Sequence, residues 1–382
     1  MTETLRRNIT QLAAAALVST AALVASPAMA QEAWDAENFD LDALIEAARK
    51  EQPITIYDLT GKVVTIAEEF SARYGVKATG VKMHEATQID LLIRESQAGN
   101  IVGDVSISAS ASALAAQVLP LGIVESWVPP LAAATIPENK QDPLVIIEDP
   151  RLWVYNTEVY DSCPISNIWE VTEETWNRRV ALQDPVGKPN FTDFFNQLET
   201  HHDEAVAKAY LDRYGKELVT DERSATAAWV KAFAQNAPLV TDSDPPVAEA
   251  VGAKGQTEPF LGLLTPARFR DAGPDGLQLG LCGGVAPFSG WLTPGYGVIS
   301  KATKSPNLAR LYIHYMTTEE GISEQTLDGK ISGNSAVPVN PEEPSNIGSV
   351  LDDLMEYNSS TAADDFEARQ DWQDLWMINY SR

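Results

Sequence analysis

Short runs of β-branched and aromatic residues alternate with helix-forming segments along the chain, and this order limits the fold more than any other feature. The first unit begins with a helix that Asp40 caps, followed by a strand at 54–57. Strands are then expected at 76–81 and 104–107, and helices at 63–74, 87–98 and 108–119. Strands that alternate with helices predict an α/β fold, with a parallel or mixed sheet and helices on both faces.

A second alternating unit begins near Leu152. Its strands are expected at 153–155, 180–182, 239–240 and 297–299, and its helices at 172–176, 191–214 with a bend around 200–203, 224–236, 306–316 and 318–326. The tail from Pro341 is acidic and polar. Its apolar residues still predict packed terminal helices, and they are Met355, Phe366, Trp372, Leu375 and Trp376.

The first 30 residues have the three parts of an export signal. Arg6 and Arg7 precede an apolar run over residues 12–24, and Ala28 and Ala30 supply the small residues of a cleavage site. The run covers 13 positions, fewer than the roughly 18 to 20 that span a bilayer. We therefore expect cleavage after Ala30 and a periplasmic protein that is not inserted in the membrane.

Charge and length exclude one class of function and favour a two-domain chain. Residues 31–382 carry 26 basic and 53 acidic side chains, a net charge of −27. A surface this acidic repels nucleic acid, which we exclude as a partner. A chain of 382 residues with 44% hydrophobic residues can bury a large core and is expected to form two domains.

The chain has two cysteines, Cys163 and Cys282. An oxidising compartment permits a disulfide between them, and two buried free thiols are the alternative. Both readings stay open at the level of sequence.

Several segments together resemble the solute-binding proteins of bacterial ABC importers, in the group that binds ferric iron, polyamines, thiamine, phosphonates and sugar phosphates. The segments, in order, are 41–50, 54–57, Glu69-Phe70, Tyr74-Gly75-Val76, Gly103-Asp104-Val105, 121–124, 153–156, 180–185, 305–309 and 315–321. Each is a weak match alone, whereas their order and spacing are specific.

The resemblance implies a type II periplasmic binding protein fold with two lobes, each a mixed sheet with flanking helices, and a ligand cleft at the hinge. Lobe one would comprise residues 31–150 and 296–382, and lobe two residues 151–295. The chain would be a monomer that closes on a small-molecule ligand and delivers it to an inner-membrane ABC permease. No cofactor and no chemical step are expected.

Candidate ligand residues of lobe one lie on two loops that lead into helices. The first loop offers Tyr57, Asp58, Thr60, Gly61 and Lys62, and the second Ser108 and Ser110. Backbone amides, a hydroxyl and an ammonium can converge on an anion at such helix starts. The alternatives are an ordinary helix cap with a solvated lysine and ordinary capping by Ser110.

The candidates of lobe two are Lys188, Asn190 and Thr192, which precede or begin the long helix. Lysines at helix starts in both lobes, Lys62 and Lys188, suggest a phosphate, phosphonate or carboxylate ligand. Asp242 and Asp244 follow a strand and could bind an amine or hydroxyl, although the sequence there is equally a plain turn.

Two aromatic residues, Trp291 and Tyr296, belong to a glycine-rich stretch that we expect to be a flexible loop. They could wall the cleft and stack on a sugar or an organic cation. The alternative is packing at the hinge.

Other ligands and functions are weaker readings. A polyamine or other cation would use Asp58, Asp242, Asp244, Trp291 and Tyr296. Ferric iron is disfavoured because the chain has no adjacent tyrosine pair and its four histidines are scattered or point apart, so no metal site is predicted. No motif with a catalytic mechanism is present, which makes a secreted enzyme the least favoured class.

Overall fold

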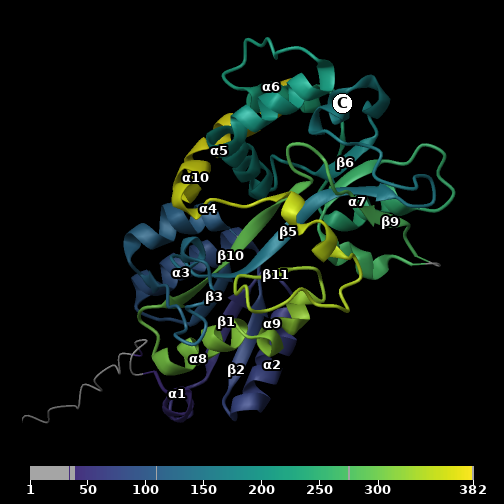
Figure 1. The fold of residues 1–382 in the computed structure, drawn as a ribbon. Helices are drawn as coiled ribbons and strands as arrows, with labels where there is room; N and C mark the ends of the chain where they lie inside the picture. Colours follow the sequence, from purple (N-terminus) through teal and green to yellow (C-terminus); the bar gives the residue numbers. More distant parts are fainter. Residues whose placement is uncertain (1–33, 35–38, 109, 274–275, 381–382) are drawn as a thin grey trace, which may run out of the picture.

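The structure, a computed structural model, describes residue 34 and residues 39–108, 110–273 and 276–380 (Figure 1). The predicted signal peptide and its cleavage after Ala30 lie outside these residues. Among the helices of the described ranges, none is long and apolar enough to cross a membrane.

One path of strand pairings runs through the described residues, in the order β2-β1-β3-β10-β5-β8-β6-β7. The strands on this path are β1 (Ile54–Asp58), β2 (Ala78–Lys82), β3 (Val105–Ser108), β5 (Val145–Asn156), β6 (Val180–Gln183), β7 (Leu239–Thr241), β8 (Leu261–Leu264) and β10 (Gly290–Ser300). Short strands β4 (Val124–Glu125) and β12 (Leu354–Met355) pair with β10, and β9 (Leu279–Leu281) and β11 (Ile331–Ser332) pair with β5. The sheet is mixed, because β1 is parallel to β2 and β3 while β10 is antiparallel to β3 and β5.

Helices cover both ends of this sheet (Figure 1). Around β1 to β3 lie α1 (Leu41–Ala48), α2 (Lys62–Tyr74), α3 (Glu85–Ala98), α8 (Pro306–Met316) and α9 (Glu319–Thr326). Around β6 to β8 lie α5 (Pro189–Tyr214), α6 (Ala225–Gln235) and α7 (Asp244–Gly252). The long strands β5 and β10 run between the two groups, in the manner expected of crossing strands, while the boundaries of the two lobes stay a prediction.

Most elements lie where the sequence pattern puts them, and the long helix also bends where it was expected. His202 has a φ of −136° inside α5, within the predicted bend at 200–203. Ser224 caps α6 by accepting a hydrogen bond from the amide of Ala227. The expectation of a flexible loop over residues 283–296 is wrong for residues 290–296, because these residues belong to β10.

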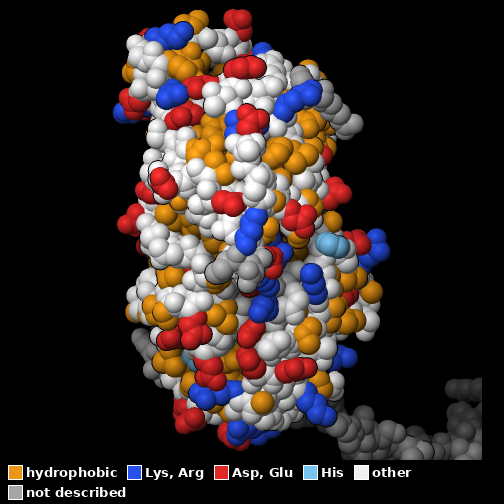
Figure 2. Space-filling view, turned by 90° about the vertical axis from the view of Figure 1, so that its right-hand side faces the viewer, with side chains coloured by type: hydrophobic (Ala, Val, Ile, Leu, Met, Phe, Trp, Pro, Cys, Tyr) orange, Lys and Arg blue, Asp and Glu red, His pale blue; other side chains and the backbone are white. Residues whose placement is uncertain are grey.

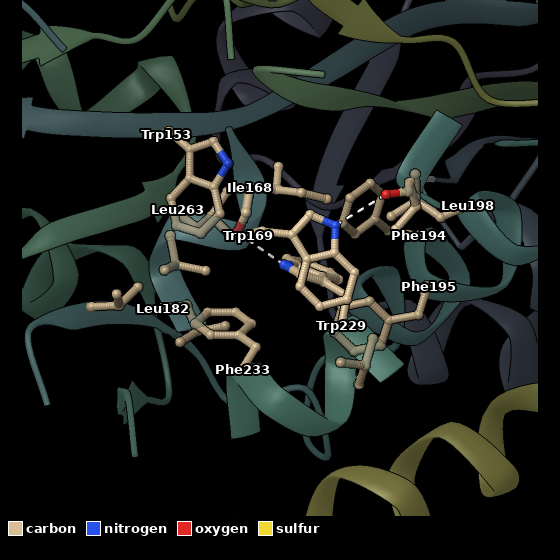
Figure 3. Close-up of a cluster of buried hydrophobic side chains, with 14 of the residues drawn as sticks. Trp153, Ile168, Trp169, Leu182, Phe194, Phe195, Leu198, Trp229, Phe233 and Leu263 are labelled. Atoms are coloured by element: carbon tan, nitrogen blue, oxygen red, sulfur yellow. Dashed lines mark hydrogen bonds between the residues drawn. The ribbon is translucent and has the colours of Figure 1, made fainter. Parts of the chain in front are cut away.

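Aromatic side chains fill the core beside α5 and α6, where rings from several elements gather (Figure 3). The indole nitrogens of Trp169 and Trp229 donate to the carbonyls of Val206 and Ile168, at 3.0 Å in each case. Burying an indole without such a partner would cost free energy, so these bonds let the largest side chains enter the core. Cys163 and Cys282 form a disulfide at the edge of this cluster, which selects the first of the two readings of these cysteines.

The last helix, α10 (Ala362–Asn379), spans from α4 (Ala111–Ala113) to α5 and α6. Trp372 and Trp376 are buried against α5, as the apolar pattern of the tail predicts. Arg369 donates to both carboxylate oxygens of Asp193 on α5, at 3.0 and 3.1 Å, and to the hydroxyl of Ser112 on α4. The tail is therefore tied to α5 by an ion pair and to α4 by a hydrogen bond.

Asp365 lies at the centre of the polar contacts between α10 and α5. It is fully buried and accepts hydrogen bonds from Asn196, Gln197 and Tyr357. Burial raises the pKa of Asp365 from 3.8 to about 6, although these hydrogen bonds oppose the shift.

The raised pKa predicts a pH dependence of stability. Because the folded state holds this proton more tightly than the unfolded chain, the stabilisation is present below pH 4 and is lost as the pH rises through 6. We expect the free energy of unfolding of wild type, relative to Asp365→Asn, to fall by up to about 3 kcal/mol between pH 4 and pH 7. Urea unfolding of both proteins across this range measures the difference.

The matched control for this experiment is Asp364→Asn, which changes the neighbouring exposed carboxylate of the same helix. Its stability should run parallel to wild type across the pH range. Parallel curves for Asp365→Asn as well would show that Asp365 titrates alike in the folded and unfolded chains.

Candidate functional site

A cleft of about 700 Å³ lies where the crossing strands meet the loops of both groups of strands. The crossing strands contribute Asp149, Arg151 and Thr293. The remaining lining residues are Leu59, Lys82, His84, Glu85 and Ala86 from one side, and Gln183, Gly187, Lys188, Pro189, Asn190, Ser243, Asp244, Pro245, Thr265, Ala267 and Arg268 from the other. The cleft therefore has walls from segments far apart in the sequence.

The floor of the cleft follows from the pairing of β5 with β10. Asp149 and Arg151 are two positions apart on β5 and so point to the same face of the sheet. Thr293 of β10 is paired with Asp149, which places its side chain on that face too. A carboxylate, a guanidinium and a hydroxyl thus stand side by side on the rigid part of the fold.

Arg151 is the most constrained cation of the cleft. It is 5% exposed, its Nη1 donates to Asp244 Oδ1 at 2.9 Å, and its guanidinium lies over the ring of Phe191 at 5.1 Å. Its Nε has no hydrogen-bond partner among the described residues. A buried donor without a partner costs free energy.

Lys188 enters the cleft from the loop between β6 and α5. The loop is a tight turn in which the amides of Val186 and Gly187 donate to Asp184. Lys188 then takes the N-cap position of α5 in an extended conformation, and Pro189 and Asn190 open the helix. The ammonium of Lys188 and the first turn of a long helix therefore reach the same wall.

Two more helices start at the cleft. His84 is the N-cap residue of α3 and Glu85 its first residue, while Ser243 and Asp244 hold the same positions on α7. Neither Ser243 nor His84 caps its helix with a side-chain hydrogen bond. Helix starts carry partial positive charge and favour anions.

Two carboxylates of the cleft have raised pKa values. Burial raises the pKa of Asp149, while Lys330 and Arg151 oppose the shift. Burial also raises the pKa of Glu85, helped by the nearby charge of Asp193 and opposed by Arg369 and Lys188. Burial therefore disfavours the charged form of both groups.

The side chains that line the cleft include more cations than carboxylates. Four cationic side chains, Lys82, Arg151, Lys188 and Arg268, line the cleft with three carboxylates, although the whole chain has a net charge of −26. Figure 2 shows Lys and Arg side chains gathered at mid-height of one face, with Asp and Glu side chains spread above and below them. The cleft is locally positive in a strongly acidic protein.

The structure brings together two of the predicted ligand residues of lobe two, Lys188 and Asn190. Thr192 lies behind them, fully buried, with its hydroxyl donating to the carbonyl of Pro189 at 2.8 Å. Thr192 therefore stabilises the first turn of α5 instead of facing the cleft. Asp242 is exposed outside the lining, next to Ser243 and Asp244, which are part of it.

The first predicted loop does not supply its charges to the cleft. Tyr57 is buried and donates to Glu95 at 2.7 Å, and Asp58 is buried and accepts from Gln325 at 3.1 Å. Lys62 pairs with Glu324 at 2.8 Å. Thr60 and Gly61 have local roles, since Thr60 accepts a hydrogen bond from the amide of Lys62 and Gly61 is the N-cap of α2. Of this loop, Leu59 lines the cleft.

The predicted serines and aromatic residues also lie apart from the main cleft. Ser108 is buried, and Ser110 lines a smaller neighbouring cavity. Trp291 shares the cleft face of the sheet with Arg151, but Phe194 stacks on it at 4.0 Å and covers it. Tyr296 is fully buried, so both aromatic side chains are packed in the interior.

Sequence reasoning missed the residues of the crossing strand and several loop residues of the cleft. They are Asp149, Arg151, Gln183, Thr265, Arg268 and Thr293. One signal was available for Arg151: it precedes the apolar segment 152–154 within a long strand, where an arginine needs a partner. The identity of that partner, Asp244, depends on tertiary structure.

Comparison with known proteins gives a clear result at the level of the fold. No family model matches the chain, and no curated protein matches its sequence. Among solved structures, iron-bound HitA from Pseudomonas aeruginosa has a TM-score of 0.62 at 13% identity, over 85% of this chain and 99% of that one.

Two further solved structures are similar. An ABC transporter substrate-binding protein from Agrobacterium tumefaciens has a TM-score of 0.61 at 14% identity, over 88% of this chain and 97% of that one. AfuA from Actinobacillus pleuropneumoniae, with fructose-6-phosphate bound, has a TM-score of 0.59 at 17% identity, over 86% and 98%. The chain therefore has the type II fold of periplasmic substrate-binding proteins, which confirms the fold predicted from the sequence.

Of these three structures, one has iron bound and one has fructose-6-phosphate bound. The part of the chain that the structure describes has no group of three or more His, Cys, Asp or Glu side chains placed to hold a metal ion. The fold alone does not select a ligand.

The ion pair in the cleft predicts an effect on stability. Arg151→Met would leave Asp244 without its cation in a largely buried place, and we expect it to lower the free energy of unfolding by about 3 kcal/mol. The double variant Arg151→Met/Asp244→Asn should be more stable than Arg151→Met, because it removes the stranded charge. Denaturant unfolding of the three proteins measures both effects.

The control is Arg268→Met, in the same cleft. Arg268 bonds to Asp271, which is half exposed, so this change should cost less than about 1 kcal/mol. Equal losses for the two arginines would contradict a special role for the buried pair.

Proposed function

We propose that this protein is the periplasmic binding component of an ABC importer and that it captures a small organic anion, a phosphate, phosphonate or carboxylate. The observation that carries the proposal is the buried guanidinium of Arg151, whose Nε has no partner among the described residues and which lines the same cleft as Lys188. A fixed, desolvated guanidinium and a helix start are strong partners for such an anion.

The walls of the cleft support capture by hinge closure. The cations come from three places: Lys82 from the β2 side, Arg151 from the crossing strand, and Lys188 with Arg268 from the β6 and β8 side. An anion bound among them would attract both walls and favour the closed state. Delivery to a membrane permease, without any chemical step, follows from the fold class and is part of the proposal.

The polyamine alternative has less support from the geometry. Of the residues on which it relied, Asp244 lines the cleft, and Asp244 is already paired with Arg151. Asp58, Trp291 and Tyr296 are buried and Asp242 lies outside the lining. We keep polyamines, thiamine and ferric iron as competing compounds in the test.

The first test is a thermal-shift screen of residues 31–382 against phosphorylated sugars, phosphonates, carboxylates, polyamines, thiamine and ferric iron. A ligand that binds the folded state raises the unfolding midpoint. We expect the shift with organic anions, and recovery of the bound compound unchanged by NMR. A shift with polyamines or iron alone would overturn the anion proposal, and conversion of the compound would overturn the binding-protein proposal.

The second test uses lysines in three different places. Lys188→Met should weaken binding of the anion by about 2 kcal/mol, roughly thirtyfold, because it removes a charged hydrogen bond. Lys62→Met should leave the affinity unchanged, since Lys62 pairs with Glu324 away from the cleft. The exposed Lys216→Met is the control for a general change of charge. Calorimetry on the four proteins measures the affinities, and equal losses for all three variants would contradict a local site.

A further inference from the structure

A second cavity of about 240 Å³ adjoins the cleft. The two share the lining residues Glu85, Ala86 and Pro189, so they are neighbours at the starts of α3 and α5. The other lining residues of this side pocket are Ile89, Asp90, Ile93, Ser110, Ala113, Gln117, Phe366 and Arg369. It lies among α3, the helical segment after Ser110, and α10.

One wall of the side pocket is apolar, while Glu85, Asp90, Gln117 and Arg369 supply polar groups elsewhere in its lining. Ile89 and Ile93 lie on the same face of α3, and Ala113 and Phe366 stand on the other elements. Ile89 and Ala113 are buried, and Phe366 packs with them. Apolar surface of this kind binds alkyl or aryl groups and gives little to a polyol, whose hydroxyls would lose water without replacement.

The wall formed by α10 is fixed in place. Arg369 is held by Asp193 and Ser112, and its guanidinium lies 4.9 Å from the centre of the Phe366 ring. The aromatic face is thus positioned by the same ion pair that ties α10 to α5. A preformed wall lowers the cost of binding.

Ser110, the residue before α4, gives the side pocket a hydroxyl group. This hydroxyl does not cap the helical segment with a side-chain hydrogen bond, while the amide of Ser110 donates to Ser108. A hydroxyl can donate to a ligand oxygen or accept from a ligand donor.

We propose that the side pocket takes the apolar substituent of an organic anion whose charged group binds in the cleft. The proposal rests on the proposed function and narrows it to phosphates, phosphonates or carboxylates that carry a short alkyl chain or one aryl ring. Ser110, expected from the sequence to contact the ligand, and Lys188, at the cleft, would then bind opposite parts of one molecule.

The test is a series of n-alkylphosphonates from methyl to hexyl, measured by calorimetry on residues 31–382. Each methylene that enters the side pocket should tighten binding about fourfold until the pocket is full. A series with constant affinity, in which methylphosphonate itself binds, would overturn the side pocket and leave the anion cleft intact.

Variants that fill the pocket give the matching result. Ala113→Leu should abolish the gain with chain length while methylphosphonate binds as in wild type. Ala116→Leu, in the same helical segment but outside the lining, is the control and should keep the gain. If Ala113→Leu does not fold, Gln117→Phe at the rim replaces it. A full gain with chain length in a folded pocket-filling variant would overturn the proposal.

The experiment can distinguish an error about the ligand of the cleft from an error about the ligand of the side pocket. If no phosphonate binds, the same proteins are measured with n-alkyltrimethylammonium ions of the same lengths. A gain with length that Ala113→Leu removes would retain the apolar subsite and overturn the anionic head group. No gain with length in this series would overturn both parts.

Discussion

The antiparallel pairing of β5 with β10 is the constraint on which the rest of the molecule depends. It joins the strands around β1 to those around β6 in one path of pairings. A Cβ atom on Gly290 would lie 2.2 Å from the carbonyl oxygen of Arg151, so this approach of the two strands requires glycine. Because the pairing is this close, the positions of Asp149, Arg151 and Thr293 on the cleft floor are fixed by the backbone.

A second level of constraint comes from buried charges that join the walls to this floor. Arg151 pairs with Asp244 at the start of α7, and Arg369 pairs with Asp193 near the start of α5. Such pairs add little net stability, because desolvation offsets their attraction, yet breaking one is costly. The first pair therefore helps to place α7 against β5, at the cleft, and the second helps to place α10 against α5, at the side pocket.

The fold could be predicted from the sequence because the local preferences for helix and strand agree with the pattern of buried apolar residues. The strand at 54–57, the cap at Ser224 and the bend near His202 all come from short-range preferences, and the structure has each of them. The prediction of a loop at residues 290–296 was wrong because Gly290, Pro294 and Gly295 are of types common in loops. In the structure close packing between strands requires Gly290 and Gly295, whose Cβ atom would lie 2.6 Å from Ile147.

The site was less predictable, for a physical reason. A lysine at a helix start has the same local sequence signal whether the cleft reaches it or a carboxylate from another element pairs with it. Lys188 faces the cleft, whereas Lys62 meets Glu324, which is 262 residues away in the sequence. Tyr57, Trp291 and Tyr296 are similar cases, since an aromatic ring suits a cleft wall and a core equally well. Only tertiary packing separates these alternatives.

In the proposed function, the acidic surface and the positive cleft act together in the recognition of an anion. A net charge of −26 repels anions from most of the surface, so an anion would gain free energy chiefly where fixed cations face it. Arg151 is such a cation, since its position is set by β5, Asp244 and Phe191 and it needs no reorganisation to accept a ligand. The adjoining apolar pocket then adds selectivity of a different kind, because it rewards the shape of the substituent and not its charge. Recognition by charge in the cleft and by apolar contact beside it would let one site reject the abundant inorganic anions that share the same head group.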